Sequence, residues 1–371
     1  MVTRKILLFA TLAVTIGVAA FTMMMPASRG EGTVAAKFKA ILEEFKELEQ
    51  KTQASFESAK EAEKPEMVKT YLANRMTLAK KALELAKADS KDPQSIEPTM
   101  FAMVIGKRDK EVVADAQELL ATQHADSTEL LDVLMRMGGD LNNRAFIEKI
   151  IKNSKTPIVQ ATGYLSLAQA IGAASEDIAE SDPAKSKALR LEALAMVKKV
   201  GTDFADAKLK EYSPAAESKN LEFALENLAI GMTVPDTEST SLDGKKVKPS
   251  DYRGKVLVLD FWATWCGPCV AMLPHSRQMV ARLRGKPFAM VSISADDDVD
   301  EVKTFAKQND MVWSQWHEGP NGAMKSKWNI NSLPSIFVID AKGVIRHKGL
   351  REDDLEDAVK KLIKEAEAET K

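Results

Sequence analysis

The two cysteines of this 371-residue chain, Cys266 and Cys269, are its only thiols and are separated by two residues. They follow an apolar run at 255–260 that predicts a buried strand. They precede apolar residues at 270–283 whose spacing of three and four predicts a helix. The pair is therefore expected at a helix N-terminus, where unpaired N–H groups and the helix dipole favour a thiolate. A thiolate beside a second thiol that resolves mixed disulfides is a redox device.

Paired cysteines also occur in metal, haem and structural sites, and the surrounding sequence disfavours each of these. A closed zinc site needs further ligands at suitable spacing, and the histidines are scattered: His124, His275, His317 and His347. Covalent haem attachment needs a histidine directly after the second cysteine, where Val270 stands. A purely structural disulfide closing so small a loop would remove little unfolded-state entropy. We expect a redox-active pair with no metal and no cofactor.

The composition is that of an ordinary globular protein, and the length of 371 residues suggests two or three domains of about 150 residues each. The chain is 45% hydrophobic and 29% charged, with a net charge of −2. A balance this close to neutral gives no indication of a nucleic acid or an anionic membrane surface as partner.

The N-terminal residues predict export. Arg4 and Lys5 precede an apolar run at 6–25, the arrangement of a signal peptide. A run of about 20 residues could equally span a bilayer as a single anchor. We therefore expect residues 1–30 to be a signal peptide or an N-terminal membrane anchor, and the protein to be periplasmic or anchored facing the extracytoplasmic side.

Residues 31–230 predict an all-α domain, either a bundle or an array of helical hairpins. The segment is rich in Ala, Lys, Glu and Leu with helical periodicity, and no fixed repeat identifies it. Prolines behind capping residues mark four expected helix starts: Asp92-Pro93, Thr156-Pro157, Asp182-Pro183 and Ser213-Pro214. Two interpretations stay open here, a scaffold that binds a protein partner and a spacer without a specific ligand.

From residue 231 onward, strand and helix patterns alternate, which predicts a mixed sheet covered by helices on both faces. The boundary follows from Gly231 and Pro235, a helix-ending glycine with a proline soon after it. The expected strands are 255–262, 288–293, a short one near 311–313, 335–339 and 344–347. The expected helices follow the cysteines and lie at 299–308, 322–328 and from 352.

Residues 231–371 resemble the TlpA/ResA type of thioredoxin-fold thiol-disulfide oxidoreductases. The resemblance is carried by Phe261-Trp262-Ala263-Thr264-Trp265-Cys266-Gly267-Pro268-Cys269, by Leu333-Pro334-Ser335 and by the extra strand and helix at 288–308. It implies a thioredoxin-like α/β fold and covers a little over a third of the chain. The helical part lies outside it.

The resemblance also implies roles for the residues of the motif. Cys266 would be the attacking thiolate, more exposed than Cys269, the resolving thiol. Trp265 would shield the pair, while Gly267 and Pro268 would set the helix entry and the redox poise.

A second group of roles concerns the residues around the motif. Pro334 would follow a cis peptide bond and leave the main chain of Leu333 free to pair with a substrate strand. Asp260 stands where thioredoxins carry a buried carboxylate that takes a proton from the resolving thiol. Met272 occupies a position where some ResA-like proteins have a glutamate.

These observations predict an exported enzyme that reduces disulfides in exported proteins and is itself re-reduced by a membrane thiol carrier. A partner-binding scaffold acting through the helical domain is the alternative from another class. A peroxiredoxin-like activity is disfavoured because no threonine stands three residues before Cys266. Copper delivery by both thiols with His275 is a further alternative.

Overall fold

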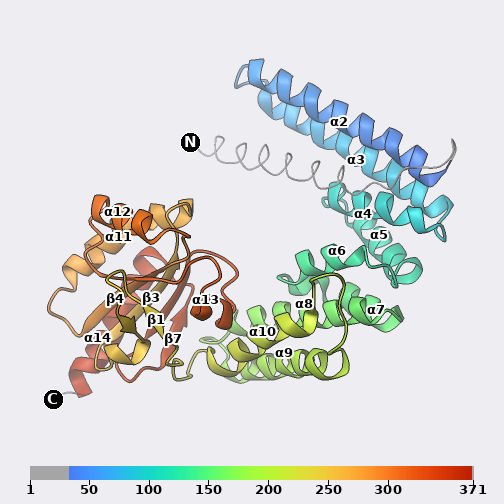
Figure 1. The fold of residues 1–371 in the computed structure, drawn as a ribbon. Coiled ribbons are helices and arrows are strands. Elements are labelled where there is room, and N and C mark those ends of the chain that lie inside the picture. Colours follow the sequence, from blue (N-terminus) through green and yellow to red (C-terminus); the bar gives the residue numbers. More distant parts are fainter. Residues whose placement is uncertain (1–32, 370–371) are drawn as a thin grey trace. The chain divides into compact units, whose positions relative to one another are not determined.

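The computed structural model describes residues 33–369 (Figure 1). The predicted signal peptide or anchor lies outside the described residues. Two compact units are present. The first comprises the described residues up to Val133 together with Arg144–Gln160, and the second comprises Leu134–Asn143 and the chain from Ala161 onward.

The first unit is helical, as predicted, and its helices pack in chain order. Contacts join α2 to α3, α3 to α4 and α4 to α5, the pattern of successive hairpins. Phe38, Phe45 and Phe101 form an edge-to-face aromatic group among them. The helices of this unit are α2 (Val34–Ser58), α3 (Lys64–Ala88), α4 (Ile96–Ile105), α5 (Lys110–Gln123) and α7 (Arg144–Asn153).

Prolines begin the later helices where the sequence placed them. Helices α8 (Pro157–Asp177), α9 (Pro183–Asp203) and α10 (Pro214–Asn227) all start at a proline, and Pro93 starts a short 3₁₀ turn. Helix α6 (Leu130–Met137) and α8 each cross the division between the units. Because the second unit includes 161–230, its extent differs from the domain boundary predicted at residue 230, which stays a prediction.

The second unit contains a five-stranded mixed sheet in the order β5-β4-β3-β6-β7. The central strand β3 runs parallel to β4, and β4 runs parallel to β5. On the other side of β3, β6 runs antiparallel to β3, and β7 runs antiparallel to β6. The strands are β3 (Val256–Trp262), β4 (Phe288–Ser294), β5 (Ser314–His317), β6 (Ser335–Ile339) and β7 (Ile345–Lys348). A separate small hairpin is formed by β1 (Ser239–Thr240) and β2 (Lys246–Val247).

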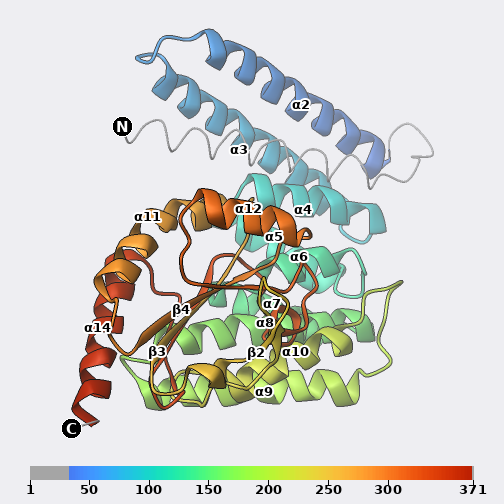
Figure 2. The same cartoon turned by 60° about the vertical axis from the view of Figure 1, so that its left-hand side comes forward.

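Helices cover both faces of this sheet, so successive residues of β3 point into different apolar clusters. Val256 and Val258 belong to the cluster beneath α11 (Gly267–Arg282), α12 (Val299–Gln308) and α14 (Glu352–Glu369). Leu257 and Leu259 belong to the opposite cluster, with α13 (Ala323–Lys327). Figure 2 shows α11 and α14 beside one another along the sheet. By this alternation Asp260 points toward α11.

One predicted strand is misplaced. The expected strand near 311–313 is a connecting segment, and β5 begins at Ser314. Asp310, with a φ of 50°, turns the chain after α12, and Met311 and Trp313 fill the apolar cluster from a loop. Buried apolar residues in this loop give the sequence pattern of a strand, although the loop does not pair with the sheet.

Candidate active site

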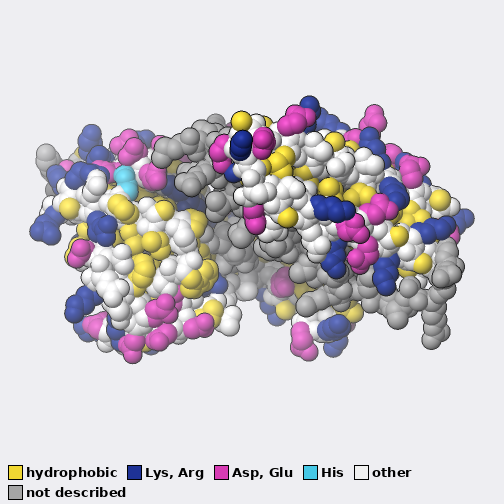
Figure 3. All heavy atoms as spheres, turned by 90° about the horizontal axis from the view of Figure 1, so that it is seen from above, with side chains coloured by type: hydrophobic (Ala, Val, Ile, Leu, Met, Phe, Trp, Pro, Cys, Tyr) yellow, Lys and Arg dark blue, Asp and Glu magenta, His cyan; other side chains and the backbone are white. Residues whose placement is uncertain are grey.

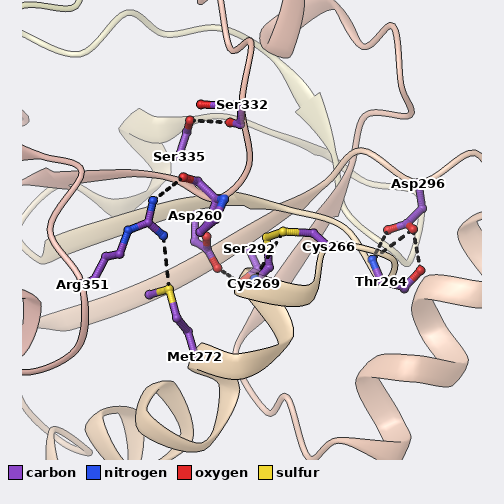
Figure 4. The surroundings of a disulfide bond; sticks show 11 residues. Asp260, Thr264, Cys266, Cys269, Met272, Ser292, Asp296, Ser332, Ser335 and Arg351 are labelled. Atoms are coloured by element: carbon purple, nitrogen blue, oxygen red, sulfur yellow. Dashed lines mark hydrogen bonds between the residues drawn. A yellow bond between two sulfur atoms is a disulfide. The ribbon is translucent and has the colours of Figure 1, made fainter. Parts of the chain in front are cut away.

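The two cysteines form a disulfide at the N-terminus of α11 (Figure 4). Cys266 is the N-cap residue, and its Sγ accepts a hydrogen bond of 3.3 Å from the Cys269 N–H. Gly267 and Pro268 form the first helical positions, where the missing N–H of proline costs no helix hydrogen bond. The helix end therefore offers N–H groups and its positive dipole to the Cys266 sulfur.

Cys266 and Cys269 are equally buried, each 5% exposed, so the expectation that Cys266 is the more exposed is wrong. Both belong to the apolar cluster beneath α11, which covers Cys266 as well as its partner. The two still differ in access, because Cys266 lines a groove of about 420 Å³ and Cys269 does not.

This groove borders the disulfide and contains residues from three segments. Trp265 is 70% exposed at its edge, whereas Trp262, three residues earlier, is buried in the core. The lining residues are Trp265, Cys266, Gly267, Pro268, Lys325, Asn331, Ser332 and Leu333. In the space-filling view, apolar side chains gather on the face of this part of the molecule that carries α11 and α12 (Figure 3). A peptide that reaches Cys266 would lie along Leu333.

The Leu333–Pro334 peptide bond is cis, the geometry that the resemblance implied. This bond precedes β6, and the Ser335 hydroxyl donates to the Ser332 carbonyl across the turn at 2.7 Å. Within residues 33–369, no hydrogen bond engages the main-chain N–H or C=O of Leu333. The main chain beside the disulfide is thus free to pair with another extended chain.

Asp260 lies on β3 behind the disulfide, on the face that α11 covers. Its Oδ2 accepts a bond of 3.3 Å from the Ser292 hydroxyl, which itself accepts from the Trp313 indole N–H at 2.9 Å. Its Oδ1 is buried and has no hydrogen-bond partner in the described part of the chain. Burial raises the pKa of Asp260 to about 7, against smaller lowering effects of Ser292 and Arg351. A carboxyl that titrates near neutrality is suited to exchange protons with a thiol.

The sequence interpretation missed two groups that support the site. The first is Asp296, a buried residue beyond β4 whose carboxylate accepts bonds from the Thr264 N–H at 3.1 Å and the Thr264 hydroxyl at 2.7 Å. These bonds fix the segment that leads into Cys266. Because the ends of the parallel strands β3 and β4 meet at one edge, the acidic run after β4 was a signal that could have found it.

The second missed group is Arg351, which lies just before α14. Its Nη2 donates to the Pro334 carbonyl at 3.2 Å, and its Nη1 lies 3.5 Å from the Met272 Sδ. No sequence pattern indicated that an arginine 17 residues beyond the cis-proline returns to the site.

Metal ligands are not assembled here. Within residues 33–369 no three His, Cys, Asp or Glu side chains are grouped so as to hold a metal ion. His275 lies against α14, with its Nε2 3.5 Å from a Glu356 oxygen. This placement gives the copper interpretation no support.

The strand order, the cis-proline and the helix-capping disulfide define a thioredoxin-fold protein with a dithiol–disulfide centre. The family described as AhpC/TSA matches residues 230–348. ResA, a thiol-disulfide oxidoreductase of Bacillus thuringiensis subsp. konkukian, is 32% identical over 140 residues, which cover 37% of this chain and 80% of the relative. ResA of Oceanobacillus iheyensis is 32% identical over 120 residues, covering 31% of this chain and 62% of that one.

The chain belongs to the ResA family of thiol-disulfide oxidoreductases, and it is a protein-disulfide oxidoreductase of thioredoxin-like fold. Among solved structures, the thioredoxin domain of a thiol-disulfide oxidoreductase from Bacteroides vulgatus is 27% identical, with a TM-score of 0.34 and coverage of 37% of this chain and 99% of that one. The N-terminal helical region lies outside these matches.

Proposed function

We propose that Cys266 and Cys269 reduce disulfides in exported proteins. The observation that carries this proposal is the cysteine pair at a helix N-terminus, facing a groove whose other wall is the unpaired main chain of Leu333. The export component rests on the charged and apolar N-terminal pattern at 1–25. Within residues 33–369 no helix is long and apolar enough to cross a membrane.

The reaction begins from the reduced dithiol. The Cys266 thiolate, stabilised at the N-terminus of α11, attacks one sulfur of the substrate disulfide. That disulfide breaks, and the other substrate sulfur leaves as a thiolate that takes a proton from water. A mixed disulfide between Cys266 and the substrate remains.

Resolution uses the second thiol. The Cys269 thiol gives its proton to the Asp260 carboxylate and attacks the Cys266 Sγ. The bond between Cys266 and the substrate breaks, the second substrate thiolate is released, and the pair closes to the disulfide seen in the structure. Two electrons have moved to the substrate, and a membrane thiol carrier would return the pair to the dithiol.

The substrate is held by its main chain. An extended segment that pairs with the N–H and C=O of Leu333 beside Pro334 brings its cysteine to Cys266. Main-chain pairing tolerates many sequences, so this arrangement suits a range of disulfide proteins. Trp265 and the Gly267-Pro268 turn form the opposite wall of the groove.

Trapping of the mixed disulfide tests the proposal. In the Cys269→Ser variant the first attack proceeds but resolution cannot, so exported proteins should accumulate as adducts on Cys266 that a reductant releases. The Cys266→Ser variant is the matched control and should trap nothing. Equal yields of adducts from the two variants would contradict the assigned roles.

The helical region gives the alternative function, a scaffold that binds a protein partner. If that function dominates, Cys266→Ser should leave the cellular phenotype unchanged, whereas removal of the helical region should abolish it. If the Cys266→Ser variant is silent in cells although the purified unmodified chain reduces disulfides, the result would favour the scaffold.

A further inference from the structure

Arg351 joins three segments that surround the active site (Figure 4). Its main-chain carbonyl accepts a hydrogen bond of 3.2 Å from the Leu355 N–H in the first turn of α14. Its guanidinium donates to the Pro334 carbonyl at 3.2 Å and lies 3.5 Å from the Met272 sulfur, one turn beyond Cys269 on α11. The side chain therefore ties the cis-proline loop to the active-site helix.

The backbone beside Arg351 is unusual. Glu352, the next residue, has a φ of 47°, in the left-handed region that a glutamate rarely adopts. Gly349, two residues before Arg351, also has a positive φ of 72°. Arg351 thus stands between two residues in the left-handed region, immediately before α14 begins at Glu352.

Arg351 is also the charged group that acts on Asp260. From β4 the group facing Asp260 is the neutral Ser292, and from β6 its ladder partner is the apolar Ile336. On α11 the two active-site cysteines are uncharged as a disulfide, and α14, which packs against β3, places the apolar Leu355 and Val359 in the cluster on this face. The positive charge of Arg351 therefore favours the ionised form of Asp260.

We propose that Arg351 is a positioning residue of the thiol-disulfide reaction, whose guanidinium holds the cis-proline loop against the active-site helix for the substrate. This inference rests on the proposed function, since it concerns the same substrate loop and the same proton transfer. It predicts two separable effects. Loss of the charge weakens the ionised form of Asp260, and loss of the hydrogen bond to Pro334 loosens the loop that pairs with the substrate.

The two effects have different signatures. Asp260 must be ionised to accept the Cys269 proton, so the resolution rate rises with pH through the pKa of Asp260. Because Arg351 lowers that pKa, its removal moves the midpoint of the rate profile to higher pH. A loosened loop raises KM for a protein disulfide and leaves the rate with a small disulfide unchanged, because a small disulfide needs no main-chain pairing.

The experiment compares Arg351→Met and Arg351→Lys with the unmodified full chain, using insulin as the protein disulfide and a small aromatic disulfide as the second substrate. For Arg351→Met we expect the pH midpoint of resolution to rise, because the lowering effect of Arg351 on the pKa of Asp260 is lost, and KM for insulin to rise several-fold. Arg351→Lys keeps the charge, so its midpoint should stay while KM for insulin rises.

Arg284→Met is the matched control, since Arg284 is an exposed arginine just beyond α11 and its loss changes the net charge equally. It should change neither quantity. An Arg351→Met enzyme with an unchanged midpoint and an unchanged KM would overturn the inference. If the unmodified chain reduces neither substrate, the proposed function fails instead, so the two failures are distinguishable.

Discussion

At the scale of single residues, the chemistry depends on a carboxyl group and a thiol that share the interior behind α11. Burial in an apolar environment raises the pKa of Asp260 to about 7, and the hydrogen bond from Ser292 and the charge of Arg351 lower it by smaller amounts. A carboxyl with an ordinary pKa near 4 would be a weak base toward a thiol at neutral pH. The raised pKa therefore suits Asp260 to accept a proton from a thiol near neutral pH.

Asp260→Asn should slow resolution of the mixed disulfide by about 100-fold or more at pH 8 while leaving the first attack by Cys266 unchanged. An amide cannot accept the Cys269 proton, so the rise in rate through pH 7 should also disappear. Rapid-mixing kinetics of adduct formation and decay would measure both steps. Asp297→Asn, at an exposed aspartate, is the charge-matched control. A variant with the unmodified pH profile would exclude Asp260 as the proton acceptor.

The residues of the site differ in how far the sequence could predict them. The spacing of Cys266 and Cys269 predicted the redox pair by itself, whereas the roles of Pro334 and Asp260 followed from the family resemblance. Arg351 and Asp296 act from distant segments, and the hydrogen bonds that bring them to the site exist only after β4 and α14 have packed. A local sequence pattern cannot predict such contacts between distant segments.

At the scale of the elements, a buried glutamate fastens α14 to α11. Glu356 is 4% exposed, and its carboxylate accepts from the Arg282 guanidinium through two nitrogens and from the Lys360 ammonium at 2.9 Å. The hydrogen bond from Arg282, more than any other effect, lowers the pKa of Glu356 to about 2. The pair fixes α14 against the helix that carries the disulfide.

Glu356→Gln should destabilise the protein by about 1–2 kcal/mol, a figure reduced for the solvent screening of the half-exposed Arg282 and Lys360. Because the folded-state pKa of Glu356 is below the unfolded value of 4.5, its contribution is present above about pH 4.5 and is lost as pH falls toward 2. Denaturant unfolding at pH 7 and pH 3 measures this. The difference in stability between the unmodified chain and the variant should be largest at pH 7 and smaller at pH 3, and an equal difference at both pH values would contradict the role of the charge.

The elements themselves were mostly predictable. The apolar run of β3 gave its position within a residue, the helix predicted at 299–308 is α12, and the prolines gave the starts of α8, α9 and α10. The misplaced strand near 311–313 shows the limit of such patterns. Met311 and Trp313 are buried from a loop, and burial without pairing leaves the same sequence signal as a strand.

At the scale of the molecule, the second compact unit includes helices that precede the thioredoxin-like fold. Leu228 is buried in the cluster that holds Leu257 and Phe261, and Phe223 lies under the Lys327 ammonium at 4.5 Å from its ring centre. The Lys348 ammonium of β7 pairs with Glu176 at 2.5 Å. Residues at the end of α10 therefore pack into the apolar cluster on one face of the sheet, and α8 contributes an ion pair to β7.

We expect a chain of residues 161–371 to be more stable than one of residues 231–371 by about 2–4 kcal/mol, the value of burying one or two large apolar side chains. Urea unfolding followed by circular dichroism would measure the difference. A Leu228→Ala variant of the longer chain should lose part of the same stability. Equal urea midpoints for the two chains would place the domain boundary at residue 230, as the sequence predicted.

The central claim, that the pair Cys266/Cys269 donates electrons to its substrates, is tested most directly by its redox midpoint. The purified full chain would be equilibrated with thiol buffers of varied poise, with tryptophan fluorescence reporting the oxidised fraction, since Trp265 borders the disulfide. We predict a value near or below about −250 mV, in the range of thioredoxin. A value near about −120 mV, that of a strong oxidant, would contradict the account and make the protein a donor of disulfides.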